Sequence, residues 1–152
     1  MILVGVVIGS KTDTDLIQPA LDMLNELGID YELSVISGHR NPGKLREYGL
    51  EAEKRGIKVI IAAAGRAAHL PGILASWTTL PVIGVPLPTS ELKGIDALLS
   101  IAQMPGGVPV ACVGIGTSGA KNAALLAAQI LGTERKEIKE AYRRYKEELA
   151  GG

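Results

Sequence analysis

The chain has 152 residues, a formal net charge of zero and only 3% aromatic residues, and we expect a single domain over residues 1–152. Because it has neither a basic cluster nor stacking aromatic side chains, we expect no nucleic-acid partner. No uncharged apolar run reaches membrane-spanning length and no signal peptide precedes the first apolar run, so we expect no membrane partner either.

Apolar, β-branched runs alternate with helical patterns along the whole chain. Strands are predicted at 2–8, 31–36, 58–63, 81–85 and 109–113. Helices are predicted at 16–27, 42–54, 68–77, 92–102, 120–131 and 134–149. Pro42 suits a first helical turn, and Gly28 and Gly56 are placed to end the first two helices. This alternation predicts a parallel α/β sheet with helices on both faces, in which the strand at 31–36 is buried.

The last predicted helix, at 134–149, is charged but keeps one apolar stripe. The stripe consists of Ile138, Ala141, Tyr142, Tyr145 and Leu149. Such a stripe suits either a helix that covers its own domain or a helix that packs on a neighbouring subunit. The alanine-rich helix before it offers small residues that permit close helix packing, which also favours a homo-oligomer.

The single cysteine, Cys112, excludes an internal disulfide and suits a reducing compartment, so we expect a cytoplasmic protein. It lies in the apolar run 108–113, which favours the role of a small core side chain over that of a nucleophile. Together with two isolated histidines it forms no metal-ligand spacing, so we expect no metal site.

Both histidines of the chain follow predicted strands, at the sheet edge where ligands bind in open α/β folds. Histidine exchanges a proton readily near neutral pH, which suits general acid–base chemistry. Arg40, next to His39, offers a planar fork for a phosphate or carboxylate, although the segment 37–42 also suits an ordinary surface turn. His69 lies among small residues, and it suits either a site or a buried, hydrogen-bonded anchor of the turn.

The loop after the first strand, 9–13, opens into a helix and could hold a phosphate at the helix N-terminus. In that case Asp13 would accept hydrogen bonds from sugar hydroxyls. The plainer alternative is a helix cap made by Thr12 or Asp13.

The segment Gly114–Gly119 matches the dinucleotide fingerprint G-x-G-x-x-G. The full fingerprint needs a second strand and an acidic residue about twenty positions later. Here that region lies in the charged last helix, so we expect a tight turn and no nicotinamide site.

Five short segments occur in order: GSKTD at 9–13, SGHR at 37–40, AAHLPG at 67–72, QMP at 103–105 and NAALLA at 122–127. Together they resemble the PurE family of purine biosynthesis, which comprises N5-carboxyaminoimidazole ribonucleotide mutases and the catalytic subunits of phosphoribosylaminoimidazole carboxylase. The resemblance implies a three-layer, flavodoxin-like fold, a homo-octamer with sites at subunit contacts, and no metal or organic cofactor.

The resemblance also implies a reaction, in which a carboxylate moves from the exocyclic nitrogen N5 to ring carbon C4 of aminoimidazole ribonucleotide. It assigns the proton transfer to His39. The substrate-binding positions that it implies are Ser10, Asp13, Ser37, Arg40, Gly65, His69 and Leu70.

Three residues depart from the family pattern. Gly38 and Asn41 replace the alanine and threonine of the usual Ser-Ala-His-Arg-Thr-Pro, and both changes are small. Arg66 stands where the mutase branch usually has glycine, whereas the branch that uses CO2 directly has Gly-Arg-Ser-Asn there. The rest of that loop resembles the mutase branch, so mutase activity is expected and direct carboxylation is the alternative. A non-catalytic nucleotide-binding protein of the same fold is a second alternative, but it would not need His39 and His69.

Overall fold

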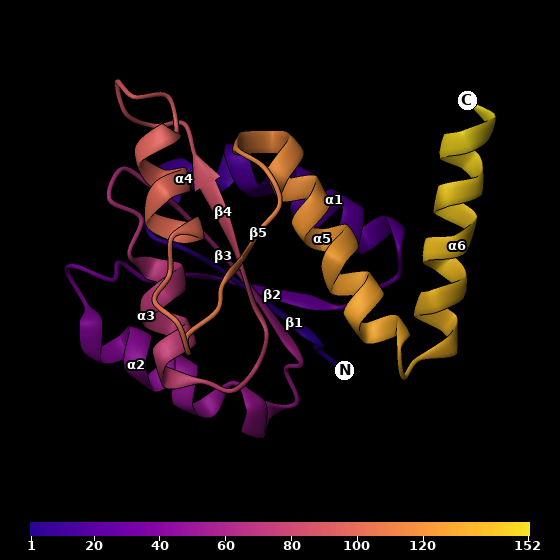
Figure 1. Ribbon diagram of the computed structural model, residues 1–152. Coiled ribbons are helices and arrows are strands. Elements are labelled where there is room, and N and C mark those ends of the chain that lie inside the picture. The colour runs from indigo at the N-terminus through magenta and orange to yellow at the C-terminus, as the bar shows by residue number, and fades with distance from the viewer.

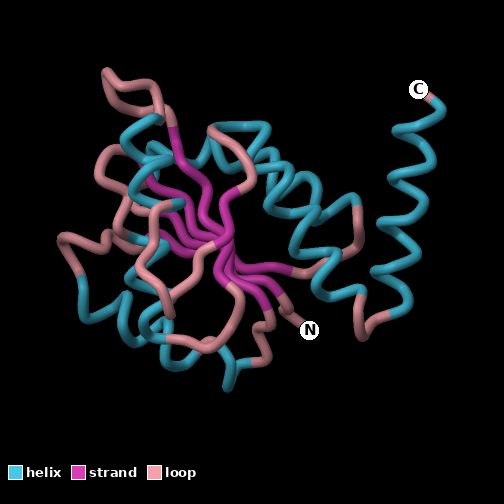
Figure 2. Tube along the Cα trace, viewed as in Figure 1, coloured by secondary structure: helices cyan, strands magenta, loops and turns pink.

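The computed structural model describes residues 1–152 and contains a parallel five-stranded sheet between two layers of helices (Figure 1, Figure 2). The strands are β1 (Val4–Ile8), β2 (Tyr31–Val35), β3 (Val59–Gly65), β4 (Val82–Leu87) and β5 (Ala111–Cys112). The helices are α1 (Thr14–Glu26), α2 (Pro42–Glu51), α3 (Leu70–Trp77), α4 (Ile95–Ala102), α5 (Gly116–Gly132) and α6 (Lys136–Gly151), with short 3-10 turns at Lys11–Asp13 and Glu53–Arg55. The strand order β2-β1-β3-β4-β5 confirms the predicted α/β fold with helices on both faces.

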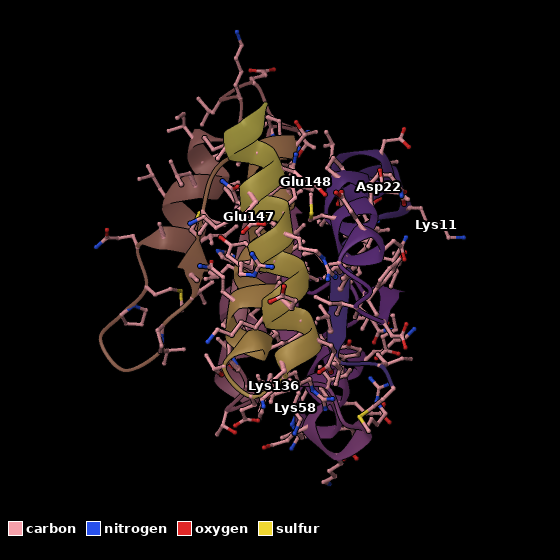
Figure 3. The ribbon with its side chains drawn as sticks, turned by 90° about the vertical axis from the view of Figure 1, so that its right-hand side faces the viewer. Lys11, Asp22, Lys58, Lys136, Glu147 and Glu148 are labelled. Carbon is pink, nitrogen blue, oxygen red and sulfur yellow. The ribbon has the colours of Figure 1, made fainter.

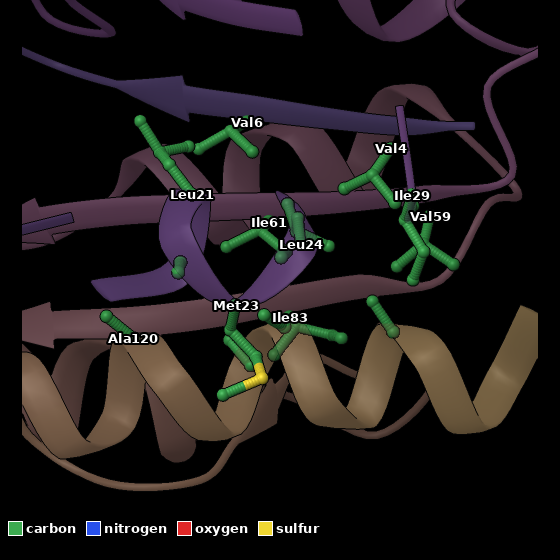
Figure 4. Close-up of a cluster of buried hydrophobic side chains, with 14 of the residues drawn as sticks. Val4, Val6, Leu21, Met23, Leu24, Ile29, Val59, Ile61, Ile83 and Ala120 are labelled. Carbon is green, nitrogen blue, oxygen red and sulfur yellow. The ribbon is translucent and has the colours of Figure 1, made fainter. Parts of the chain in front are cut away.

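Hydrophobic clusters fill both faces of the sheet. The largest lies between the sheet and helices α1 and α5, and Figure 4 shows part of it, including Val6, Leu24 and Ile61. A second cluster covers the opposite face, where Leu45 of α2 and Leu74 of α3 are fully buried. Strands β1 and β4 are buried along their whole length, as expected for parallel strands covered on both faces.

The predicted helix ends at Gly28 and Gly56 are confirmed, since both glycines adopt positive φ values of 71° and 94° just after a helical segment. The tight turn predicted at Gly114–Gly119 is confined to its first residues, because α5 begins at Gly116, before the helix start predicted at residue 120. Gly119 lies in the first turn of α5, and a Cβ atom on it would overlap the carbonyl of Gly114, so this position requires a residue without a side chain.

Two strand predictions were wrong in detail. The strand at 31–36 was expected to be buried, but β2 pairs only with β1 and is an edge strand, with Leu33 37% and Val35 38% exposed. The run at 109–113 forms a strand over only two residues, Ala111 and Cys112. Cys112 is only half-buried, but it packs against the small hydrophobic cluster of Ala68, Ala97 and Ile101, so it is a peripheral core side chain.

Helix α6 covers its own domain with its first turns and extends away from it with its last ones (Figure 1). Ile138 is 4% exposed and belongs to the main core, and Ala141 and Tyr145 pack against that core. Leu149, the last residue of the predicted stripe, is 65% exposed. Figure 3 views this helix from outside and labels Glu147, which pairs with Arg143 along the exposed face. None of the helices is both long and apolar enough to cross a membrane.

A polar network fastens the edge strand β2 to the helix beside it. Tyr48 of α2 packs over Gly5 of β1, and its hydroxyl donates a hydrogen bond of 3.2 Å to Glu32 of β2. Arg55 forms an ion pair with the same carboxylate at 2.6 Å. Hydrogen bonding from Arg55 lowers the pKa of Glu32, whereas burial, with a smaller contribution from Glu32, raises the pKa of Tyr48.

We expect Gly5→Ala to lower the free energy of unfolding by about 1–3 kcal/mol, the usual cost of overpacking a core. The reason is that the new Cβ would overlap the Tyr48 hydroxyl and displace it from Glu32. Gly43→Ala is the matched control, because Gly43 lies in the first turn of α2 with no atom near its Cβ position. Denaturant unfolding of both variants checks this, and a Gly5→Ala variant as stable as wild type would contradict it.

Candidate active site

A cavity of about 410 Å³ opens at the carboxyl ends of β1, β2, β3 and β4. Four loops line it, because parallel strands all end at the same edge of the sheet. Seven of the eight predicted site residues lie in its wall: Ser10, Asp13, Ser37, His39, Gly65, His69 and Leu70. Segments that are far apart in sequence are therefore brought together as a single candidate site.

Arg40 is the predicted site residue that this cavity does not include. Its side chain is exposed, and its backbone N–H donates a hydrogen bond of 3.2 Å to the Ser37 hydroxyl. That bond fixes the turn in which His39 lies. Within one chain, Arg40 therefore supports the loop and does not line the cavity.

The two histidines form the central contact of the cavity. His39 Nε2 and His69 Nδ1 are 2.9 Å apart, and the two rings meet edge to face with an interplanar angle of 84°. One nitrogen must donate and the other accept, so the tautomer of each ring fixes that of the other. Both side chains are exposed, which excludes the alternative that His69 is a buried anchor of its turn. The pair can pass a proton between the rings or hand it to a bound molecule.

Asp13 is the one buried charged residue of the chain, with 9% of its surface exposed. Burial raises the pKa of its carboxyl, and the backbone of Ser10 lowers it by a smaller amount. Although Asp13 occupies the position before α1, its side chain makes no capping hydrogen bond. Its carboxylate is therefore available to a ligand in the cavity.

Ser10 caps the short 3-10 turn at Lys11–Asp13 that precedes α1. Its hydroxyl accepts the Thr12 N–H at 3.3 Å and lies 2.9 Å from the Thr12 hydroxyl. The alternative of a side-chain cap on α1 by Thr12 or Asp13 is not borne out, because Asp13 holds the N-cap position without a capping hydrogen bond from its side chain. This turn delays the start of α1 and directs the Ser10 and Thr12 side chains into the cavity wall.

Sequence reasoning did not assign Thr12, Arg66 or Thr89 to the site, yet all three line the cavity. Thr89 follows β4, and its hydroxyl lies so close to Gly65 that a Cβ there would overlap it. Its position at a strand end was the available signal. The remaining wall consists of small or apolar residues: Gly9, Gly38, Ala64, Ala67 and Ala68.

The side-chain arrangement does not suggest a metal centre, since no three His, Cys, Asp or Glu side chains lie close enough together to hold an ion. What the cavity combines is a coupled pair of imidazoles, a buried carboxylate, several hydroxyls and one guanidinium. That set can bind an anionic molecule with sugar hydroxyls and exchange protons with it.

Known proteins resemble this chain over almost its whole length. The AIR carboxylase family model matches residues 3–151. The N5-carboxyaminoimidazole ribonucleotide mutase of Saccharolobus solfataricus is 56% identical over 146 residues, which span 96% of this chain and 91% of that protein. The mutase of Pseudomonas aeruginosa is 55% identical over 144 residues, which span 95% of this chain and 88% of that protein.

Solved structures agree with the sequence comparison. The crystal structure of Treponema denticola PurE superimposes with a TM-score of 0.89 at 30% sequence identity, covering 99% of this chain and 93% of that one. The five strands, the loops at their carboxyl ends and the last helix thus follow an architecture already seen in a relative. With both the sequence and the fold matched from end to end, the chain belongs to the AIR carboxylase family.

Proposed function

We propose that this chain is an N5-carboxyaminoimidazole ribonucleotide mutase of purine biosynthesis. The observation that carries the proposal is the hydrogen bond between His39 and His69 inside a cavity lined by small residues. The mutase names of relatives more than half identical to this chain support it independently. A non-catalytic nucleotide-binding protein would have no use for two coupled imidazoles at one site.

The reaction breaks the bond between N5 and the carboxyl carbon and forms a bond from that carbon to C4. C4 must then lose its proton, and N5 must gain one. In our proposal His39 gives a proton to N5 as CO2 leaves, and it takes a proton back from C4 after the new bond has formed, so that the enzyme ends unchanged. His69 holds the His39 ring in one orientation and tautomer through the 2.9 Å hydrogen bond.

Small residues suit the transfer of a carboxyl group through free CO2. Ala64, Gly65, Ala67 and Ala68 line the cavity without polar side chains, and CO2 released among them would meet few groups that could divert it. Asp13 would accept hydrogen bonds from the ribose hydroxyls, and the Ser10 and Ser37 hydroxyls would donate to the phosphate. Leu70, which is 4% exposed, anchors the loop that carries His69.

We also propose that the chain assembles into a closed homo-oligomer in the cytoplasm, with eight copies as the family resemblance implies. Exposed apolar side chains around α4 support an assembly, because Leu92, Ile95 and Leu99 are 61%, 51% and 60% exposed. A neighbouring copy would cover that face, and the single unpaired Cys112 agrees with a reducing compartment.

Two parallel assays test the function. One supplies N5-carboxyaminoimidazole ribonucleotide, and the other supplies aminoimidazole ribonucleotide with bicarbonate. We expect the 4-carboxy product to form efficiently only in the first assay. Efficient formation in the second assay alone would instead assign direct carboxylation, and no product in either would exclude both activities.

For the catalytic step, we expect His39→Asn to lower kcat by about 10²–10⁴-fold, the usual cost of removing a general acid–base group. Ribonucleotide binding should remain largely intact, because asparagine can still hydrogen-bond His69. Steady-state kinetics and calorimetric titration with the product measure the two effects separately. Turnover within a few-fold of wild type would remove His39 from the mechanism.

Asp13→Asn should make the protein more stable at pH 7 and yet raise KM by about tenfold, through the loss of a charged acceptor for the ribose. Burial raises the pKa of Asp13 in the folded state, so ionised Asp13 opposes folding at neutral pH. This cost disappears as the pH falls toward the ordinary aspartate pKa of about 3.9, where the two proteins should become equally stable.

Thermal unfolding at a series of pH values checks the stability effect, with Asp15→Asn as the control. Asp15 lies exposed in the first turn of α1, where its charge favours the helix N-terminus, so its replacement should slightly lower stability. If the Asp13→Asn variant were less stable than wild type at pH 7, the ionised Asp13 side chain would not destabilise the folded protein, and its assignment as a ligand-binding residue that lowers stability would be contradicted.

Light scattering at micromolar concentration should give a mass eight times that of the 15.9 kDa chain. The physical reason is the apolar surface that a single copy leaves in contact with water around α4. A mass equal to that of one chain would overturn the assembly proposal.

A further inference from the structure

Arg66, the first residue after β3, has a backbone conformation that its side chain disfavours. Its φ is 55°, and Lys93, with φ of 54°, is the one other non-glycine residue with a positive value. The left-handed region brings Cβ close to the next carbonyl oxygen, so only glycine adopts it freely. Strained residues of this kind cluster at functional sites, where the surrounding structure holds them in place.

The segments on both sides of Arg66 fix its backbone. On one side, Gly65 pairs with Leu87 in the register of β3 and β4, and the Thr89 hydroxyl fills the space where a Cβ would lie. On the other side, Ala68 is 1% exposed and belongs to a hydrophobic cluster. The turn is therefore held at both ends, which fixes the position of the Arg66 backbone in the cavity wall.

Arg66 is also the only lysine or arginine in the wall of the cavity. Its guanidinium is exposed and forms no ion pair within the chain, unlike Arg55 and Arg143. The one carboxylate of the wall, Asp13, belongs to the loop after β1. A cation without an intramolecular partner, held at the edge of a cavity, suits an anion that arrives with the ligand.

We propose that Arg66 is a specificity-determining residue that pairs with an oxyanion of the ribonucleotide. The inference rests on the proposed function, because that substrate carries two oxyanions, a phosphate and the migrating carboxylate. Both present paired oxygens that match the planar fork of a guanidinium. The gain in ligand affinity accounts for an arginine in a conformation that glycine would adopt without strain.

The test compares Arg66→Gly with Lys93→Gly. Both replacements relieve a positive φ, so both variants should be at least as stable as wild type in thermal unfolding. Only Arg66 lines the cavity, so only Arg66→Gly should raise KM, by about 10- to 100-fold, with kcat changed much less. Arg66→Lys, which keeps the charge but loses the fork, should recover part of the affinity.

Calorimetric binding of two ribonucleotides identifies the oxyanion. Aminoimidazole ribonucleotide carries the phosphate alone, and its 4-carboxy derivative carries both groups. If Arg66→Gly weakens both ligands equally, Arg66 binds the phosphate, and if it weakens only the carboxylated one, Arg66 binds the carboxylate.

Equal KM and equal ribonucleotide affinity in Arg66→Gly and Lys93→Gly would overturn the inference. That failure differs from failure of the proposed function, in which the wild-type protein would not convert N5-carboxyaminoimidazole ribonucleotide at all. The binding measurements need no turnover, so they test Arg66 in either case.

Discussion

The fold depends on covering both faces of three central strands at once. Every residue of β1 and β4, and the first five residues of β3, are buried. The backbones of these strands therefore lie close to the helices on each side. On one face this approach depends on α5, whose inner surface is made of buried alanines: Ala120, Ala123, Ala124, Ala127 and Ala128. Small side chains let α5 lie against both the sheet and α1, and larger ones would force the layers apart.

This arrangement explains how distant loops form one cavity. With parallel strands packed from both sides, the chain can only leave the sheet at its carboxyl edge, where each strand passes into a loop. His39 follows β2 and His69 follows β3, and the two strands are separated in the sheet by β1. The 2.9 Å contact between the rings therefore bridges the loops on either side of β1, and the loop after β1, with Ser10 and Asp13, lines the same cavity.

The sequence predicts the parts of this structure that local pattern controls. Continuous apolar runs such as 59–63 identify the central strands, because a strand buried on both faces needs apolar residues at every position. In β2 the polar residues Glu32 and Ser34 interrupt the apolar pattern, and such alternation is typical of a strand with one exposed face, so the expectation of a buried strand was already at odds with the sequence. The length of β5 leaves no such signal, because only Ala111 and Cys112 of its apolar run pair with β4.

The candidate site divides in the same way. Its loops were predictable, because they follow strands and carry the only histidines. The hydrogen bond between His39 and His69 was not, since it depends on how closely the loops after β2 and β3 approach each other and on the turn that the Ser37 hydroxyl holds. The exclusion of Arg40 from the cavity likewise follows from the direction of that turn, which no spacing in the sequence encodes.

Most buried polar groups far from the cavity have a hydrogen-bond partner, whereas two residues in the cavity wall lower the stability of the folded protein. The buried hydroxyl of Tyr48 has Glu32 as its partner, and Glu32 in turn has Arg55. The buried side-chain oxygen without a partner lies on Asp96, at the start of α4. In the cavity wall, by contrast, a carboxylate with a raised pKa and an arginine with a positive φ stand within one site.

Such costs are sustainable only where the surrounding structure is rigid, because a flexible loop would relax into a lower-energy conformation. The close contact between Gly65 and Thr89 and the burial of Ala68 and Leu70 supply that rigidity at the end of β3. The densely packed sheet thus does more than bring the loops together. Its stability offsets the strain and desolvation that leave Asp13 and Arg66 without partners of their own, and so prepares the cavity for a ligand that carries both hydroxyls and negative charge.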